Sequence, residues 1–146
     1  MRVGYYKENQ KGHFMSASQI ILTREDFCKL KEMKCFHHGS DYEKLEEEIK
    51  HAKIVGEGEL PRDIVTMNRQ ITLLNMEENK KINMTIVYPC DADFFQHKIS
   101  VLSPLGMTLL GLKVNQVINW TFPDGDTKTL KVLGVQPQST VKVIVH

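Results

Sequence analysis

The segment Gln70-Ile-Thr-Leu-Leu-Asn-Met-Glu-Glu-Asn-Lys-Lys-Ile-Asn-Met-Thr-Ile-Val-Tyr88 contains two runs in which apolar and polar residues alternate. A period of two is typical of β-strands with one buried face, and it predicts strands at 70–75 and 81–88. The polar residues 76–80 between them are expected to form the turn of a hairpin. Similar runs predict three further strands, at 99–102, 117–122 and 129–133. The C-terminal half is therefore expected to form a mostly antiparallel sheet.

One short helix interrupts these strands. Ser103 is a favourable N-cap residue and Pro104 suits the first helical position, so a helix is predicted over 104–110. Its residues are apolar almost all round, which indicates burial, and Gly111 is a typical stop. Beyond the last predicted hairpin, the run Val141–Val145 is a candidate edge strand.

The sequence before residue 56 has helical spacing instead. Thr23-Arg-Glu-Asp26 and Ser40-Asp-Tyr-Glu43 are start signals of the capping-box type. Each is followed by apolar residues three or four positions apart, and the break between the two helices contains Gly39. We therefore expect a short antiparallel helical hairpin over 19–55, with helices of about 14 residues that span about 21 Å.

These patterns divide the chain into four parts. Residues 1–18 lack periodicity and are expected to be a flexible tail. After the hairpin at 19–55, the Gly- and Glu-containing residues 56–61 form a linker, and residues 62–146 form the C-terminal domain. The expected fold class is α+β, in which helices and strands are segregated along the chain.

The composition bounds the class of protein. A chain of 146 residues with 41% hydrophobic and 25% charged residues is typical of a globular domain with its own core. The net charge of +1 disfavours a purely electrostatic nucleic-acid binder. No apolar run is long enough to span a bilayer. Three cysteines cannot all pair within the chain, which favours the reducing cytoplasm.

Several sequence blocks of the C-terminal half occur together in one known family. Pro61-Arg-Asp-Ile-Val-Thr-Met-Asn68 resembles the Pro-x-Asp-Val-Val-Thr-Met-Asn segment of the regulator of nucleoside diphosphate kinase group. Five more blocks resemble that group in the same order: Val87-Tyr-Pro89, Asp91-Ala-Asp93, Ile99-Ser-Val101, Ser103-Pro-Leu-Gly106 and Leu109-Leu-Gly-Leu112. The resemblance covers about residues 60–135, and the wider relatives are the Gre transcript-cleavage factors.

The resemblance implies an FKBP-like C-terminal domain, which is a curved antiparallel sheet packed on one short helix. It also implies docking on bacterial RNA polymerase at the rim of its secondary channel. The residues that it assigns to docking are Asp91, Asp93, Ser103, Pro104 and Leu105. The protein would then be a cytoplasmic monomer that needs no cofactor or metal, contacts no membrane and reaches nucleic acid only through the polymerase. Turn chemistry is an alternative explanation for the two aspartates, because Asp side chains commonly bond backbone amides in loops.

The tip of the predicted hairpin bears on the mechanism. In Gre factors a long coiled-coil arm enters the channel, and two acids spaced Asp-x-x-Glu at its tip hold a catalytic metal. Asp41 and Glu43 lie just past the corresponding turn, but the position three residues after Asp41 is Lys44. Both acids also suit the positive N-terminal end of a helix.

The resemblance and the short arm together favour a non-enzymatic regulator of transcription elongation that binds polymerase without stimulating transcript cleavage. The alternative is a Gre-type cleavage-stimulating factor whose tip carboxylates, Asp41 and Glu43, reach the Mg2+ of the polymerase. A third possibility is an interaction domain with an unrelated partner.

A metal site and a nucleophilic site are both disfavoured. Cys28, Cys35, His37 and His38 lack the paired ligand spacing of a structural zinc site, and Cys28 could equally pack between the two helices. Ser103 lies outside any Gly-x-Ser-x-Gly elbow, and its place before a proline at a helix start already explains it.

A prolyl isomerase is disfavoured as well, although such enzymes share the FKBP-like fold. Their pocket needs walls made of several aromatic side chains. The C-terminal half offers Trp120 together with Tyr88, Phe94, Phe95 and Phe122. Trp120 alternates with its neighbours as an ordinary strand residue does, and a shared fold does not carry an activity with it.

Overall fold

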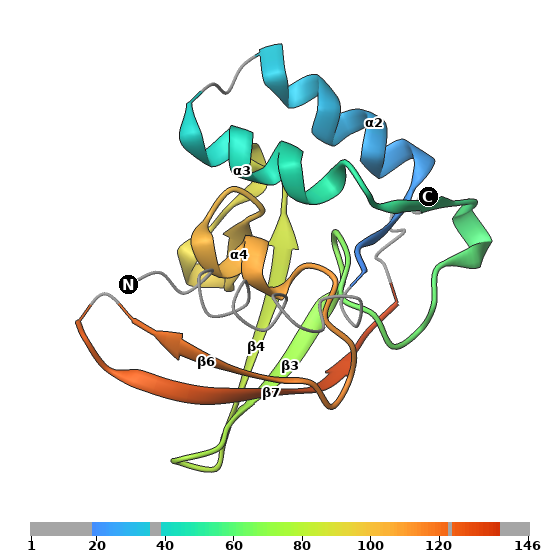
Figure 1. The fold of residues 1–146 in the computed structure, drawn as a ribbon. Coiled ribbons are helices and arrows are strands. Elements are labelled where there is room, and N and C mark those ends of the chain that lie inside the picture. The colour runs from blue at the N-terminus through green and yellow to red at the C-terminus, as the bar shows by residue number, and fades with distance from the viewer. Residues whose placement is uncertain (1–18, 36–38, 123, 138–146) are drawn as a thin grey trace.

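The computed structural model describes residues 19–35, 39–122 and 124–137 (Figure 1). The tail predicted at 1–18, the edge strand at 141–145 and the histidines at 37 and 38 lie outside these residues. The architecture is mixed α+β, with a curled five-stranded sheet and few helices. In Figure 1 two helices form a layer at the top of the view, and the ribbon of the last two strands crosses the bottom.

The sheet is built from the predicted strands. Its order is β5-β4-β3-β7-β6, and every neighbouring pair is antiparallel except β4 and β5. The strands are β3 (Gln70–Asn75), β4 (Lys80–Val87), β5 (Lys98–Ser100), β6 (Val117–Thr121) and β7 (Thr127–Val135). Along β3, Ile71 and Leu73 are buried and alternate with partly exposed neighbours, as the period of two predicted. A bulge opposite Thr72 and Leu73 shifts the register of β7 and increases the local twist.

The helix α4 (Pro104–Leu109) begins at the predicted residue and ends one residue before the predicted end. The Ser103 Oγ accepts a hydrogen bond of 3.0 Å from the backbone N–H of Gly106, and Pro104 occupies the first turn. Gly111 follows the helix with φ +93°, a conformation that glycine adopts without strain. At that point the backbone also passes close to Ile20, since a Cβ on Gly111 would lie 2.9 Å from the Ile20 Cγ1.

Two helices precede the sheet in the chain. They are α2 (Arg24–Glu32), continued by the 3₁₀ turn η2 (Met33–Cys35), and α3 (Ser40–Ile49). Leu30 of α2 and Leu45 and Ile49 of α3 are completely buried. The Tyr42 hydroxyl, in the first turn of α3, donates to the backbone carbonyls of Leu30 and Lys31 at the end of α2, both at 3.3 Å. The start of α3 therefore packs against the end of α2.

The sequence did not predict the two strands that flank these helices. β1 (Ile21–Thr23) leads into α2, β2 (Lys53–Val55) follows α3, and the two pair in parallel. Parallel pairing brings together residues about 30 positions apart and needs a long connection, which the two helices provide. The predicted linker also contains a 3₁₀ turn, η3 (Glu57–Glu59). The Glu59 carboxylate closes this turn by accepting a hydrogen bond of 2.9 Å from the Gly56 N–H.

Three details of the helical region differ from the sequence-based expectation. The helices have 9 and 10 residues rather than 14, because α2 passes into the 3₁₀ turn η2 after Glu32 and α3 ends at Ile49. The capping box predicted at Ser40 is wrong: Ser40 is itself helical, and the N-cap is Gly39 with φ +99° and no side-chain hydrogen bond. Cys28 is exposed and does not pack between the helices.

The segment before β3 is irregular but firmly held. Val65 exchanges backbone hydrogen bonds with Gly111 and Leu112, at 3.0 and 2.8 Å. The buried Arg69 guanidinium donates from Nη1 to the carbonyls of Pro61 and Ile64, at 2.5 and 3.0 Å. Burial lowers the pKa of Arg69, and the nearby Asp63 opposes that change. These contacts explain why the Pro61–Asn68 block keeps a defined shape without regular secondary structure.

One hydrophobic core spans the helices and the sheet. Its buried members come from both halves of the chain: Leu22, Leu30, Leu45 and Ile49 from the first, and Ile71, Leu73, Ile86, Leu109, Ile118 and Val132 from the second. A hydrogen bond of 3.0 Å from the Thr66 hydroxyl to the Ile21 carbonyl adds a polar link between the halves. None of the helices in the described residues is long and apolar enough to cross a membrane.

Candidate protein-docking surface

The residues that the resemblance assigned to docking gather around one short strand, β5. Two 3₁₀ turns precede it, η4 (Pro89–Asp91) and η5 (Phe94–Gln96), and α4 follows it. Both turns and α4 pack against β5. Because β5 is an edge strand of the sheet, the loops around it face solvent at that edge.

Asp93 holds the η5 loop together. Its Oδ1 accepts from the Phe95 N–H at 3.0 Å, and its Oδ2 accepts from the Gln96 Nε2 at 2.9 Å. Its backbone also pairs with Lys98 through two hydrogen bonds of 2.9 Å. The turn chemistry considered for the aspartates is confirmed at Asp93, so a charge reversal there would disturb the loop as well as any docking.

Ser103 also has a structural task. Its Oγ donates to the Ser100 carbonyl at 2.7 Å while accepting from the Gly106 N–H. A Cβ on Gly106 would lie 2.3 Å from that same carbonyl oxygen. The Ser-Pro-Leu-Gly block is therefore a tight join between β5 and α4, and the serine hydroxyl is engaged in it.

Two of the five assigned residues are exposed. Asp91 and Pro104 lie open to solvent, whereas Asp93, Ser103 and Leu105 are half-buried. The first two are the side chains of this set that are most available to a partner.

The structure adds two residues that the sequence reasoning did not assign to docking. Phe94 is 85% exposed and Phe95 is 92% exposed, and their rings meet edge to face with centroids 5.8 Å apart. They were considered for the wall of an isomerase pocket, but side chains this exposed wall no pocket. Trp120, by contrast, is buried in the core. The sequence does carry one signal for an exposed aromatic pair: Phe94 and Phe95 are adjacent and lie between two predicted strands rather than within one.

A polar contact ties the helical layer to this surface. Tyr88, the residue before η4, donates its hydroxyl to the Asp26 Oδ1 of α2 at 2.5 Å. Asp26 is buried, and the Lys29 ammonium lies 5.6 Å from the centre of the Tyr88 ring. Burial and the Asp26 carboxylate raise the pKa of the Tyr88 hydroxyl far above its usual value. Thr23 caps α2 as predicted, but the Asp26 carboxylate, which was expected to complete the capping box, accepts a hydrogen bond from Tyr88.

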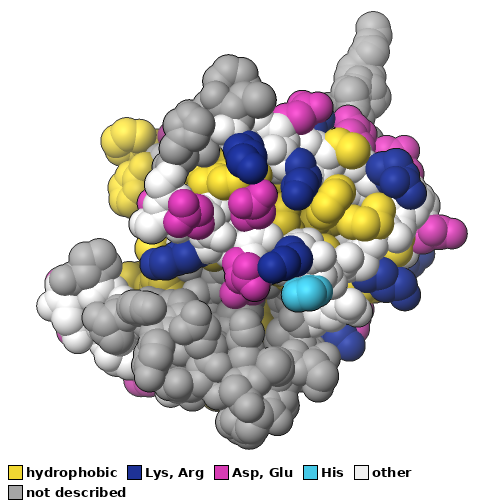
Figure 2. All heavy atoms as spheres, turned by 45° about the horizontal axis from the view of Figure 1, so that its top comes forward, with side chains coloured by type: hydrophobic (Ala, Val, Ile, Leu, Met, Phe, Trp, Pro, Cys, Tyr) yellow, Lys and Arg dark blue, Asp and Glu magenta, His cyan; other side chains and the backbone are white. Residues whose placement is uncertain are grey.

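The acids near the start of α3 are exposed, and two acids further along the helix form ion pairs. Asp41 and Glu43 lie in the first turn, where the helix dipole favours negative charge. Further along, Glu46 lies 3.9 Å from Lys31 of α2 and Glu47 lies 3.2 Å from Lys50. Figure 2 shows acidic and basic side chains interspersed on the face that carries the helices. The acidic residues of α3 therefore do not make a surface of one charge.

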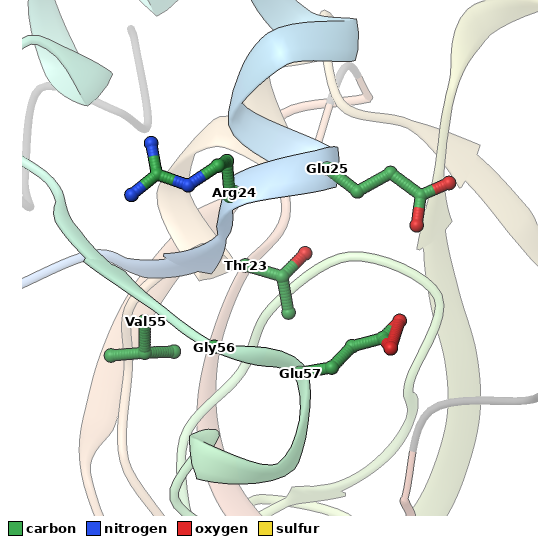
Figure 3. A pocket seen from close by; sticks show the side chains of 6 residues that line it. All are labelled: Thr23, Arg24, Glu25, Val55, Gly56 and Glu57. Atoms are coloured by element: carbon green, nitrogen blue, oxygen red, sulfur yellow. The ribbon is translucent and has the colours of Figure 1, made fainter.

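A shallow hollow lies between the start of α2 and the end of β2. Figure 3 shows its lining, where the side chains of Arg24 and Glu25 point in opposite directions above Val55 and Glu57. No cysteine or histidine is among its six lining residues, and the Thr23 hydroxyl already caps α2. Among the described residues, no three His, Cys, Asp or Glu side chains are grouped to hold a metal ion.

Comparison with known proteins assigns the family. The model of the GreA/GreB transcription elongation factor C-terminal family matches residues 60–137, which is more than half of the chain. The chain belongs to the GreA/GreB family. The matched region of this GreA/GreB member begins just before the Pro61–Asn68 block and contains the whole five-stranded sheet with α4.

Individual relatives agree with this assignment. The regulator of nucleoside diphosphate kinase of Escherichia coli strain K12 is 34% identical over 94 residues, which cover 64% of this chain and 69% of that protein. Transcription elongation factor GreA of Acetivibrio thermocellus is 30% identical over 116 residues, which cover 80% and 72%. The solved GreA/GreB factor of Nitrosomonas europaea superposes with a TM-score of 0.73 at 30% identity, covering 81% of this chain and 98% of that one.

Proposed function

We propose that this GreA/GreB family member binds bacterial RNA polymerase at the rim of the secondary channel and regulates elongation without stimulating transcript cleavage. Family membership supports a polymerase partner. In this proposal the curled sheet with α4 is an FKBP-like docking module, and α2 and α3 form a shortened arm. The protein acts in the bacterial cytoplasm as a monomer, and it is not itself an enzyme.

The observation that carries the proposal is the length of the two helices. At 1.5 Å per residue, the 10 residues of α3 span about 15 Å, which is shorter than the 21 Å expected from sequence. Docking at the rim leaves such an arm near the channel entrance. A carboxylate assists a bound Mg2+ only at about 2.1 Å from it, so an arm that ends far from the ion gives no catalytic help.

The acids near the tip support the same conclusion. Asp41 is followed three positions later by Lys44, so the Asp-x-x-Glu pair is missing. Asp41 and Glu43 lie in the first turn of α3, where a negative charge stabilises the helix whatever the protein binds. Their presence is therefore explained without a metal.

A transcript-cleavage assay on backtracked elongation complexes tests the proposal. We expect no faster cleavage when the protein is added alone, and inhibition of cleavage when it is added with a Gre factor. The double variant Asp41→Ala, Glu43→Ala should inhibit the Gre factor as well as the wild type does, because docking belongs to the C-terminal module. Stimulation by the wild type but not by the double variant would instead support the cleavage-stimulating alternative.

A further inference from the structure

The most exposed large apolar side chains of the described residues are neighbours in one loop. Phe94 and Phe95 are 85% and 92% exposed, whereas Met76 and Val117, the other exposed large apolar residues, reach 47% and 39%. A phenylalanine ring left in water forgoes the free energy that its burial would contribute to folding. Two adjacent rings in this state are typical of the centre of a protein-binding site.

Hydrogen bonds hold the backbone of the loop that carries both rings. Asp93 caps η5 at the Phe95 N–H, and its carboxylate also accepts from the Gln96 side chain. The backbone pairing of Asp93 with Lys98 closes the base of the loop, and His97 completes it in a left-handed conformation with φ +58°. The two rings contact each other edge to face, with centroids 5.8 Å apart. A partner would therefore bind a loop whose backbone is already ordered, which lowers the cost of binding in conformational entropy.

The charge around the pair indicates what it binds. The segment Pro89-Cys-Asp-Ala-Asp-Phe-Phe-Gln-His97 has two aspartates and no lysine or arginine, although the whole chain has a net charge of +1. Carboxylates beside the rings repel nucleic-acid phosphates, so base stacking is disfavoured. They attract lysine and arginine, whose cations also bind favourably over phenylalanine rings. The surface that fits is apolar with basic residues at its edge.

We propose that Phe94 and Phe95 are the anchor by which this protein grips RNA polymerase, with both rings inserted in an apolar depression of the polymerase that is edged by lysine or arginine. The proposal rests on the proposed function, because it names the contact residues of that same docking. Their position supports it, since η5 packs on β5 together with the elements that carry the exposed Asp91 and Pro104.

Binding of purified core RNA polymerase to the full-length chain tests the proposal. The double variant Phe94→Ser, Phe95→Ser should bind at least about 30-fold more weakly, as is typical when hot-spot rings are removed. Its melting temperature should equal that of the wild type, because the rings make no core contacts. The variant Phe94→Leu, Phe95→Leu, which keeps apolar bulk, should retain part of the affinity. The matched control Met76→Ser, Val117→Ser changes two exposed apolar residues outside the loop and should bind as the wild type does.

The outcomes separate this inference from the proposed function. Unchanged affinity of the double serine variant overturns the anchor while leaving polymerase binding intact. A wild type that fails to bind polymerase overturns both. If the wild type self-associates and the double serine variant is a monomer with full polymerase affinity, the rings join two copies of this chain and the anchor is again overturned. If the wild type binds single-stranded RNA through these rings and does not bind polymerase through them, the anchor is overturned as well.

Discussion

At the scale of single residues, Gly106 shows how a small side chain determines a join between elements. A Cβ at this position would lie 2.3 Å from the Ser100 carbonyl oxygen and 3.0 Å from the Ser103 Oγ. Neither the backbone of β5 nor the capping serine can move without breaking the hydrogen bonds that start α4. The glycine in the Ser-Pro-Leu-Gly block is therefore required by the close packing of α4 on β5.

We expect Gly106→Ala to lower the free energy of unfolding by about 3 kcal/mol, because overpacking against backbone cannot relax cheaply. Urea denaturation measures the change. Gly58→Ala is the matched control, since Gly58 is exposed and a Cβ there would meet nothing within 4 Å. A control that loses as much stability as Gly106→Ala would show that the loss does not come from the Ser100 contact.

At the scale of elements, the hydrogen bond between Tyr88 and Asp26 joins α2 to the loops around β5. The two residues are 62 positions apart, and the hydroxyl–carboxylate distance is 2.5 Å. Tyr88 directly precedes η4, so this one hydrogen bond connects the helical layer to the surface around β5.

We expect Tyr88→Phe to destabilise the protein by about 2 kcal/mol at neutral pH, as is typical for loss of a hydrogen bond to a charged group. Folding raises the pKa of Tyr88, so the neutral phenol stabilises the folded state below the ordinary pKa of about 10 and loses that effect as the pH rises above it. The stability difference between wild type and Tyr88→Phe should therefore shrink above about pH 10. Urea denaturation at neutral and alkaline pH measures both quantities, and a difference that is constant with pH would contradict this account.

At the scale of the whole molecule, the single core argues against two separately folding parts. Leu45 of α3 and Ile71 of β3 are completely buried in the same hydrophobic cluster. The linker predicted at 56–61 suggested a division, but the Thr66 hydroxyl donates to the Ile21 carbonyl of β1, and the backbone at Gly111 passes close to Ile20. Packing across the two halves makes cooperative unfolding the expected behaviour.

We expect Leu45→Ala to cost about 3 kcal/mol and to shift the unfolding of helices and sheet together. Trp120, the one tryptophan of the chain, lies in β6 and reports on the sheet by fluorescence, while circular dichroism reports mainly on the helices. Val117→Ala, at an exposed position of the same strand, serves as the control and should leave both midpoints nearly unchanged. Loss of helical signal with an unaltered Trp120 transition would show that the two parts fold independently.

Local signals determined most of the secondary structure. Alternation placed β3 and β4 within one residue of their observed bounds, because a half-buried strand must alternate wherever it lies in a fold. Ser103 and Pro104 placed the start of α4, since an N-cap needs only the next three residues. The sequence does not identify Gly39 as the N-cap of α3, because Ser40, one position later, is a favourable N-cap residue by local criteria.

Contacts between residues that are far apart in the chain were decided only by the tertiary structure. The pairing of β1 with β2 and the bond from Tyr88 to Asp26 join positions far apart in the chain, and no local pattern specifies either contact. The exposure of Phe94 and Phe95 has the same origin, because aromatic residues in a loop lie in the core or in solvent according to how the loop is fixed. Here Asp93 and Lys98 fix it with the rings outward, so the sequence determined the sheet and α4, while the packed chain determined the surface that they present.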